Sequence, residues 1–374
     1  MPKIVHVVGA RPNFMKIAPV IDALRAQPWI EQRLVHTGQH YDDQMARVFF
    51  HELGLPRPDR DLEVGSGSQA EQTAAVMVRF ERVVDEERPD LVVVVGDVNS
   101  TLAATLVAAK AGVPVAHVEA GLRSFDLTMP EEINRIVTDR LASILLTPSP
   151  DGDENLRREG VPEARIFCVG NVMIDTLLRH RAQAPWDRLA GALGLEPRRY
   201  AVLTLHRPAN VDSAERLVTL LDRLAPIAAS MPVIFPIHPR TAKRLEEHGL
   251  RGAASGLRLV TPLGYLDFLA LMDHAACVLT DSGGIQEETT VLGVPCFTIR
   301  DNTERPVTIA CGTNTLVGAD ARDLAAAFAD FQATGGKRGR VPELWDGRSG
   351  QRVAEVVARA LGGGVATAPP AAAG

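Results

Sequence analysis

The hydrophobic pattern of the chain alternates between short apolar runs and longer amphipathic stretches. Apolar runs rich in Val, Ile and Leu are typical of strands that are buried on both faces of a parallel sheet. In the first half of the chain, the predicted strands are residues 4–9, 34–38, 91–96, 113–118, 144–147 and 166–169. The predicted helices between them are residues 18–26, 71–86, 100–111 and 132–143. This alternation predicts a doubly wound, Rossmann-like unit.

The second half of the chain repeats the architecture without repeating the sequence. Its predicted strands are residues 201–205, 233–237, 257–260, 278–280, 294–299 and 315–317. Its predicted helices are residues 214–229, 241–248, 265–275, 285–292 and 321–331. The fold class that follows is α/β, with two Rossmann-like doubly wound domains that face a cleft.

A length of 374 residues agrees with two domains. We expect an N-terminal domain at residues 1–175 and a C-terminal domain at residues 176–350, with the crossing between the halves near residues 179–199. A final helix at residues 351–361 has the N-terminal domain as a candidate packing partner. Residues 362–374 consist mainly of Gly, Ala and Pro and are expected to be disordered.

Composition excludes several classes of protein. The net charge of −6 disfavours a nucleic-acid partner and gives no reason to expect a membrane surface as partner. The four cysteines are far apart and form no CxxC pair, so we expect neither structural zinc nor a disulfide framework. No signal peptide and no apolar span of ~20 residues is visible, and a reducing cytoplasm is the expected location. The motif GxGxxG is absent, which argues against a nicotinamide or flavin cofactor, and GxxxxGK[ST] is absent as well.

Ionisable residues follow most of the predicted strands. Ligands of open parallel sheets bind beyond the carboxyl ends of the strands, so these residues are candidates for a binding site. The first half contributes Arg11, Lys16, Asp97, Glu119 and Arg123, and the second half contributes His206, Arg207, His238, Ser282 and Arg305. Each residue alone is as well explained by a solvated surface, but their recurrence at nearly every strand end predicts a shared cleft.

The stretch 280–288 has the pattern of a strand, a tight turn and a helix. A helix that begins at Gly283-Gly284 directs free N–H groups and a positive dipole end toward its N-terminus, which suits a phosphate. Glu288 lies about one turn further and suits ribose hydroxyls. The alternative is an ordinary turn in which Ser282 caps the helix. The second half is therefore expected to hold a nucleotide.

Three carboxylates, Asp97, Glu119 and Glu131, distinguish the first half. Carboxylates that share a cleft raise one another's pKa, which allows one to act as an acid while another acts as a base. Glu131 and Glu132 also follow Pro130 at a predicted helix N-terminus, and pairing with the helix dipole explains at least one of them equally well. The first half is thus expected to carry out the chemistry.

Taken together, the motifs resemble the non-hydrolysing UDP-N-acetylglucosamine 2-epimerases. The resemblance covers residues 3–320 approximately, and its motifs are long, specific and in family order. The matching stretches are GARP at residues 9–12 with Lys16, TGQH at 37–40, VGDVNS at 95–100, HVEAGLR at 117–123, PEEINR at 130–135, TLHR at 204–207, TDSGGIQEE at 280–288 and RDNTERP at 300–306.

The resemblance implies a glycosyltransferase-B fold, a homodimer and interconversion of UDP-GlcNAc and UDP-ManNAc through a 2-acetamidoglucal, without NAD or metal. It assigns the acid/base roles to Asp97, Glu119 and Glu131 in the N-terminal domain. It assigns UDP to the C-terminal domain. The implied contacts with the leaving diphosphate are His206 and Arg11, those with phosphate are Ser282, Gly283 and Gly284, and that with ribose is Glu288, while Lys16 and Arg305 line the pocket. The strand-end positions add Arg123, Arg207 and His238 as candidate substrate-binding residues.

Other functions remain open on the sequence alone. One is 2-epimerisation of another UDP-2-acetamido sugar, such as a 2,3-diacetamido uronate, and another is hydrolysis to UDP and ManNAc. A glycosyltransferase of the same fold requires an acceptor. A UDP-sugar-binding protein without catalysis would not need the three carboxylates.

One motif departs from the family pattern. Bacterial members that UDP-GlcNAc activates allosterically carry Gln-His-x-x-x-Met, whereas here Met45 comes one position late after Gln39-His40. The altered spacing predicts that the allosteric site is missing. Initial rates should then depend hyperbolically on the UDP-GlcNAc concentration, and a sigmoidal dependence would contradict this prediction.

Overall fold

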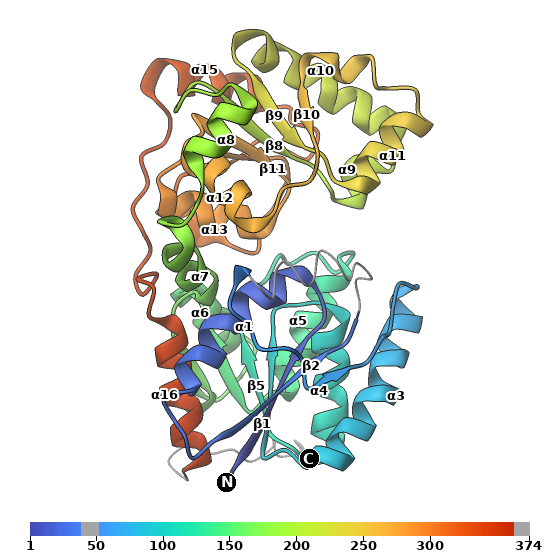
Figure 1. Ribbon diagram of the computed structural model, residues 1–374, viewed down its shortest axis with the longest axis vertical. Helices are drawn as coiled ribbons and strands as arrows, with labels where there is room; N and C mark the ends of the chain where they lie inside the picture. The colour runs from blue at the N-terminus through green and yellow to red at the C-terminus, as the bar shows by residue number, and fades with distance from the viewer. Residues whose placement is uncertain (39–51, 363–374) are drawn as a thin grey trace. The chain divides into compact units, whose positions relative to one another are not determined.

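The computed structural model describes residues 1–38 and 52–362. The chain divides into two compact units: unit 1 is Met1–Arg179 with Glu343–Gly374, and unit 2 is His180–Pro342. The sequence-based boundaries, after residues 175 and 350, lie a few residues away. Each unit is a parallel sheet with helices around it, which confirms the predicted α/β fold class (Figure 1).

In the described part of unit 1, seven parallel strands form one sheet in the order β3-β2-β1-β4-β5-β6-β7. Their bounds are β1 Lys3–Val8, β2 Glu31–His36, β3 Arg60–Asp61, β4 Leu91–Val95, β5 Val115–Val118, β6 Ile144–Thr147 and β7 Ile166–Cys168. The strand order reverses between β1 and β4, and such a switch point is where doubly wound sheets bind ligands. The central strand β4 is buried along its whole length, as its run of Leu and Val predicts.

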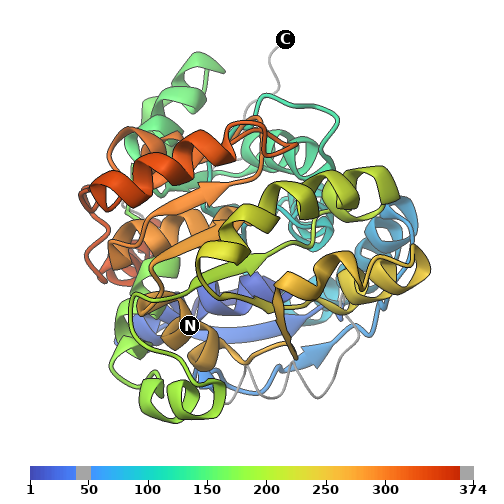
Figure 2. The same cartoon turned by 90° about the horizontal axis from the view of Figure 1, so that it is seen from above.

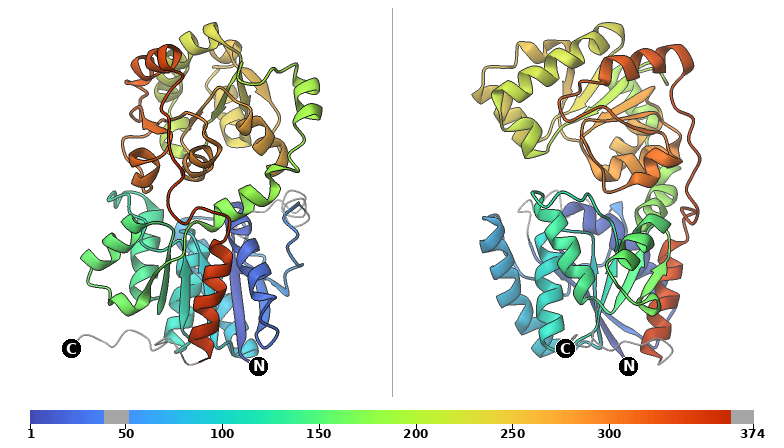
Figure 3. Two further views of the ribbon diagram at one scale, coloured as in Figure 1. Left: turned by 90° about the vertical axis from the view of Figure 1, so that its left-hand side faces the viewer. Right: turned by 180° about the vertical axis from the view of Figure 1, so that it is seen from behind.

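The helices of unit 1 pack on its sheet and on one another. Their bounds are α1 Arg11–Leu24, α3 Gln69–Glu87, α4 Asn99–Lys110, α5 Pro130–Leu141, α6 Pro150–Arg158, η1 Glu163–Arg165, α7 Val172–Arg181 and α16 Ser349–Leu361. The last helix, α16, lies along α1 (Figure 3). Asp175 of α7 fixes the start of α16, because the Asp175 carboxylate accepts the N–H groups of Ser349 at 3.0 Å and Gly350 at 2.6 Å.

Unit 2 contains six parallel strands in the order β10-β9-β8-β11-β12-β13. The strands are β8 Ala201–Thr204, β9 Val233–Pro236, β10 Arg258–Val260, β11 Cys277–Thr280, β12 Cys296–Thr298 and β13 Asn314–Leu316. The helices are α8 Trp186–Leu193, α9 Pro208–Val211, α10 Ala214–Ser230, α11 Pro239–Glu247, η2 Ala253–Gly256, α12 Tyr265–Asp273, α13 Gly283–Leu292, α14 Pro306–Ala310 and α15 Leu324–Thr334. Helices cover both faces of the sheet (Figure 2). The switch point lies between β8 and β11.

The stretch expected to cross between the halves contains more helix than the sequence suggested. It includes the end of α7 and all of α8, which ends at Gly194 in the left-handed conformation. The ring of Trp186 stacks on His274 of unit 2 with 4.1 Å between the ring centroids. Aromatic packing therefore attaches α8 to the rest of unit 2. No helix within residues 1–38 and 52–362 is long and apolar enough to cross a membrane.

Candidate functional site

The switch point of unit 2 brings together two of the predicted motifs. His206 and Arg207 follow β8, and Ser282 follows β11 directly before α13. Helix α13 begins at Gly283, and the side chain of its N-cap residue Ser282 makes no capping hydrogen bond. The N–H groups of the first turn are therefore left for another acceptor, as a phosphate site requires.

A buried carboxylate, Asp281, holds this switch point together. It accepts hydrogen bonds from the backbone N–H of His206 at 3.1 Å, the backbone N–H of Arg207 at 2.9 Å and the amide of Asn210 at 3.1 Å. The Nδ1 atom of His206 lies 2.9 Å from Asp281 Oδ1. Burial disfavours the ionised form, but these donors outweigh it and lower the pKa of Asp281. His206 is thus oriented by a carboxylate that, like His206 itself, follows a strand.

The guanidinium of Arg305 lies against the start of α13. A Cβ atom at Gly283 would come within 2.4 Å of Arg305 Nη1, so only glycine permits this approach. Arg305 Nε is 2.9 Å from Glu287 Oε1, and Nη1 also pairs with Glu304. Burial opposes ionisation of Glu304, but Arg305 and Arg300 outweigh it and hold its pKa well below the usual range. Buried carboxylates therefore fix a cation beside the helix N-terminus.

Two further predicted residues lie in the same unit. Glu288 is buried in the second turn of α13, and the hydroxyl of Tyr265 donates to its Oε1 atom at 3.2 Å. Burial, together with this carboxylate, raises the pKa of Tyr265. His238 is exposed at the start of α11, where its Nδ1 atom accepts the N–H of Arg240 at 3.2 Å. The rings of His206 and His238 have centroids 6.3 Å apart.

At the switch point of unit 1, Lys16 of α1 pairs with Glu119, which follows β5. Both side chains are buried. Gly96, which follows β4, lies beside this pair, because a Cβ atom there would be 3.2 Å from Lys16 Nζ and 3.4 Å from Glu119 Oε2. Helix α1 and the loops after β4 and β5 thus meet at the carboxyl ends of the strands.

Asp97 forms an ion pair with a different cation from that of Glu119. It pairs with Arg135 of α5, whose Nη2 atom also lies 2.6 Å from Glu132 Oε2. The amide of Asn134 donates to the backbone carbonyl of Asp97 at 2.8 Å. Asp97 and Glu119 therefore each face a cation, which differs from the cluster of mutually repelling carboxylates that the sequence suggested.

The remaining predicted residues of unit 1 lie in different surroundings. Glu131 is exposed in the first turn of α5. Arg123 is buried, with Nη1 2.7 Å from Asp139 Oδ2, and with Nε and Nη2 2.7 and 2.8 Å from the oxygens of Glu159. Because its donors are directed at these carboxylates, we propose a structural role for Arg123 in place of the expected contact with substrate. The side chain of Arg11 and the motif at residues 39–45 lie outside the described part of the chain.

One face of α5 carries several polar residues. In the sequence analysis, Glu132, Asn134 and Arg135 were noted only as part of a motif, without a role in the site, and Asp139 was not named. Glu132, Arg135 and Asp139 recur at helical spacing, and Asn134 adjoins them. All four are buried. A polar stripe on a helix that packs inside a domain is the signal that would have indicated their burial, because such groups are buried only with partners.

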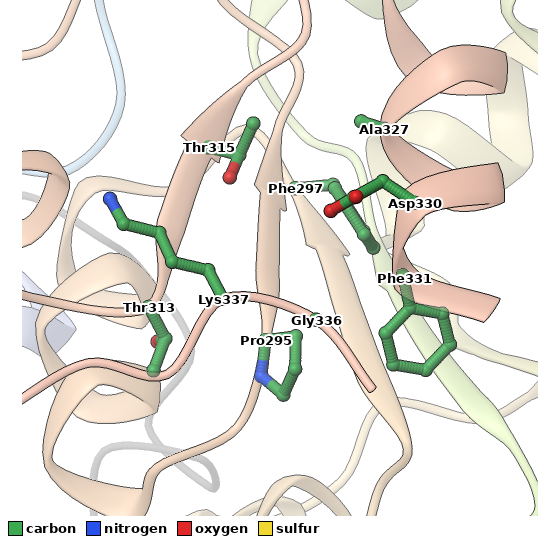
Figure 4. Close-up of a pocket in the computed structure, with 9 residues that line it drawn as sticks. All are labelled: Pro295, Phe297, Thr313, Thr315, Ala327, Asp330, Phe331, Gly336 and Lys337. Atoms are coloured by element: carbon green, nitrogen blue, oxygen red, sulfur yellow. The ribbon is translucent and has the colours of Figure 1, made fainter. Parts of the chain in front are cut away.

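Two hollows lie at the surface of unit 2. One is lined by Pro295, Phe297, Thr313, Phe331, Lys337 and their neighbours (Figure 4). Pro295 and Thr313 directly precede β12 and β13, so this hollow is at the amino ends of the strands and does not belong to the switch-point site. The other has a volume of about 320 Å³ and is mostly apolar, with Ile237 and Val260 at the carboxyl ends of β9 and β10.

Comparison with known proteins agrees with this geometry. The family model described as UDP-N-acetylglucosamine 2-epimerase matches residues 22–358. The UDP-N-acetylglucosamine 2-epimerase of Methanocaldococcus jannaschii is 42% identical over 363 residues, which are 95% of this chain and 98% of that protein. The UDP-2,3-diacetamido-2,3-dideoxy-D-glucuronate 2-epimerase of Pseudomonas aeruginosa is also 42% identical, over 86% of this chain and 90% of that protein.

A solved structure extends the likeness to three dimensions. The crystal structure of the M. jannaschii UDP-GlcNAc 2-epimerase in complex with UDP-GlcNAc and UDP matches with a TM-score of 0.89 and 42% identity, over 95% of this chain and 99% of that one. The family model spans most of the chain, and both relatives match over nearly their full lengths. The chain belongs to the UDP-N-acetylglucosamine 2-epimerase family.

Proposed function

We propose that the chain interconverts UDP-GlcNAc and UDP-ManNAc by eliminating UDP and adding it back to a 2-acetamidoglucal intermediate. The observation that carries this proposal is the position of Asp97 and Glu119 at adjacent strand ends of unit 1, each beside a buried cation. Epimerisation at an unactivated carbon requires proton removal on one face of the sugar and proton delivery on the other. Two fixed carboxylates supply the groups for this transfer.

In this proposal, unit 2 binds the leaving group. As the base removes the C2 proton, the C–H electrons form the C1–C2 double bond and the C1–O bond breaks toward UDP. Negative charge therefore develops on the diphosphate, and the start of α13 with Arg305 and His206 stabilises it where it appears. Glu288, oriented by Tyr265, accepts hydrogen bonds from the ribose hydroxyls. UDP stays bound and adds back to C1 after a proton returns to the opposite face of C2.

In unit 1, Asp97, Glu119 and Glu131 exchange the proton. The reverse reaction runs through the same groups with the acid and base roles exchanged, so the three form one set rather than a fixed acid and a fixed base. Lys16 and Arg135 keep the Glu119 and Asp97 carboxylates in place and reduce the cost of charge near the sugar.

The products of the wild-type chain test the proposal. Incubation with UDP-GlcNAc in D2O, followed by NMR, should show UDP-ManNAc with deuterium at C2. Release of free ManNAc with UDP would support the hydrolysing alternative instead. An unchanged spectrum with bound UDP-GlcNAc would reduce the chain to a UDP-sugar-binding protein and refute the proposal.

A second candidate substrate is a UDP-2,3-diacetamido uronate, because the P. aeruginosa relative named for it has the same 42% identity to the chain as the M. jannaschii enzyme, over a somewhat shorter match. The chemistry at C1 and C2 would be the same, and a carboxylate at C6 would need an additional cation. Competition between the two UDP-sugars decides between them, since the true substrate should have the larger kcat/KM.

A further inference from the structure

A buried histidine–aspartate pair connects the two loops that carry Asp97 and Glu119. The Nδ1 atom of His117 is 2.6 Å from Asp139 Oδ1, and its Nε2 atom is 2.8 Å from the backbone oxygen of Gly96. Both side chains of the pair are buried. His117 belongs to β5, two residues before Glu119, whereas Gly96 directly precedes Asp97 after β4. One ring therefore spans the ends of both strands.

The direction of these hydrogen bonds follows from the partners. A backbone carbonyl only accepts, so His117 Nε2 donates to Gly96. Asp139 also accepts the N–H of Gly121 at 3.0 Å and Nη1 of Arg123 at 2.7 Å. Burial disfavours its ionised form, but the charges and hydrogen bonds of His117 and Arg123 outweigh it and lower the pKa of Asp139. The Asp139 carboxylate thus joins the His117 ring, the Gly121 N–H and Arg123 in one buried network.

The loop that this pair holds is conformationally strained. Glu119 has φ of +74°, a backbone conformation that a residue with a side chain rarely adopts. The backbone N–H of Glu119 donates to Leu146 at 2.9 Å, and Gly121 has no space for a Cβ atom beside the carbonyl of Gly152. Such a conformation persists only where its surroundings determine it.

We infer that Asp139 and His117 are positioning residues that hold the Glu119 and Asp97 loops at a fixed separation for proton transfer. The inference rests on the proposed function for the chemistry and on the geometry of unit 1 for the positioning. Misplacement of a reacting group by about 1 Å lowers turnover by about 10²-fold. The hydrogen-bond partners described for the pair all belong to unit 1, whereas the described side chains proposed to bind UDP, His206, Glu288 and Arg305, belong to unit 2. The affinity for UDP should therefore not depend on the pair.

The test compares Asp139→Asn with Asp175→Asn. Asp175 is the matched control, because it is also a buried aspartate of unit 1 that accepts backbone N–H groups, but at the start of α16. We expect Asp139→Asn to lower kcat by about 10²-fold with KM and UDP affinity changed less than about threefold. Asp175→Asn should lower the melting temperature with kcat changed less than about threefold. Equal kcat in the two folded variants would overturn the inference.

Two further variants cover the case in which Asp139→Asn does not fold. His117→Gln keeps an amide donor near the Nε2 position, whereas His117→Ala removes the ring and both of its contacts. Turnover should fall in both variants and recover by about tenfold in His117→Gln relative to His117→Ala. The absence of any difference would contradict the role of the Gly96 hydrogen bond.

Hydrogen exchange gives a readout that is independent of the reaction. Backbone amides of residues 118–122 should exchange at least about tenfold faster in His117→Ala than in the wild type, and Asp175→Asn should leave them unchanged. Unchanged exchange in His117→Ala would refute the positioning pair. A wild-type chain that makes no epimer would refute the proposed function, whatever the exchange result.

Discussion

At the scale of single residues, the carboxylates of the site differ in what surrounds them. Asp97 pairs with Arg135 and keeps a quarter of its side chain exposed, and Glu119 pairs with Lys16 in a nearly closed setting. In both cases the ion pair with the cation holds the carboxylate in one position. The same side chains thus serve electrostatics and geometry at once.

Asp97→Asn removes a group that can exchange a proton but keeps its size. We expect kcat to fall by about 10²-fold or more, while UDP still binds with wild-type affinity. Calorimetry with UDP and an NMR assay of epimerisation measure the two quantities. Asp85→Asn, on the exposed surface of α3, is the control and should leave both unchanged. A parallel loss of binding and turnover would contradict the division of roles between the units.

The lowered pKa of Asp281 predicts how the free energy of unfolding depends on pH. Its pKa in the folded protein is lowered, so the stability that it contributes is present above the unfolded-state value of about 3.9 and is lost as the pH falls below it toward the folded value. Asp281→Asn should be less stable at pH 7 and should lose less of its free energy of unfolding between pH 5 and pH 3. Urea denaturation at several pH values measures this. Asp222→Asn, exposed on α10, should retain the wild-type slope.

At the scale of elements, apolar runs and helical spacing were sufficient to predict most strands and helices. Strand β3 was missed because Arg60 and Asp61 are polar and exposed, so no apolar run marks it. Helix α8 was missed because two prolines and a tryptophan made residues 179–199 resemble a linker. Its apolar residues Trp186, Leu189 and Leu193 nevertheless recur at helical spacing. Tertiary packing by Trp186, which no local pattern reveals, stabilises that helix.

For the site, the sequence predicted which residues lie there better than it predicted their partners. Strand-end positions singled out Lys16, Asp97 and Glu119 because a parallel sheet collects its strand ends at one edge. The surroundings of Arg123 could not be predicted, because a cation in a motif has the same sequence whether it faces a ligand or a buried carboxylate. Asp139 was missed, and the partners of the strand-end residue Asp281 were not predicted, because those partners are distant in the chain and only the fold brings them close.

A substitution at the start of α13 tests whether this helix N-terminus binds UDP. Gly283→Ala places a Cβ atom against Arg305 and Glu304, so we expect the affinity for UDP to fall by about tenfold, equivalent to the loss of one charge-assisted hydrogen bond of ~1.5 kcal/mol. Calorimetry measures it. Gly191→Ala in α8 is the matched control, because no atom lies within 4 Å of the new Cβ atom. It should stabilise the protein by roughly 0.5–1 kcal/mol and leave UDP affinity unchanged, and a UDP affinity of wild-type strength in Gly283→Ala would contradict the site.

At the scale of the whole molecule, the chain leaves unit 1 after Arg179 and returns to it at Glu343. The returning segment is fastened to unit 1 by side chains as well as by helix packing. Trp345 is buried, and its indole N–H donates to the carbonyl of Pro148 at 2.9 Å. The stability of unit 1 therefore depends on residues near the end of the chain.

Trp345→Ala tests this dependence. A buried tryptophan replaced by alanine costs about 3–5 kcal/mol, and we expect that loss in the unfolding of unit 1. Denaturant unfolding followed by circular dichroism measures it, and UDP affinity in the absence of denaturant should be retained. Trp29→Ala is the control, because Trp29 is substantially exposed and should cost much less. Similar losses in the two variants would show that the returning segment does not anchor unit 1.

The packing of α16 along α1 also bears on biosynthesis. The residues of unit 2 form one uninterrupted stretch, so its sequence is complete on the ribosome once Pro342 has been added. Unit 1 begins to emerge first, yet α1 must wait for α16, the last described helix to be translated. The apolar face of α1 that α16 covers is thus bare for most of the chain's synthesis. Unit 1 is thus the first to be started by the ribosome and the last to be completed. A chain released before α16 would present that face of α1 to chaperones and proteases.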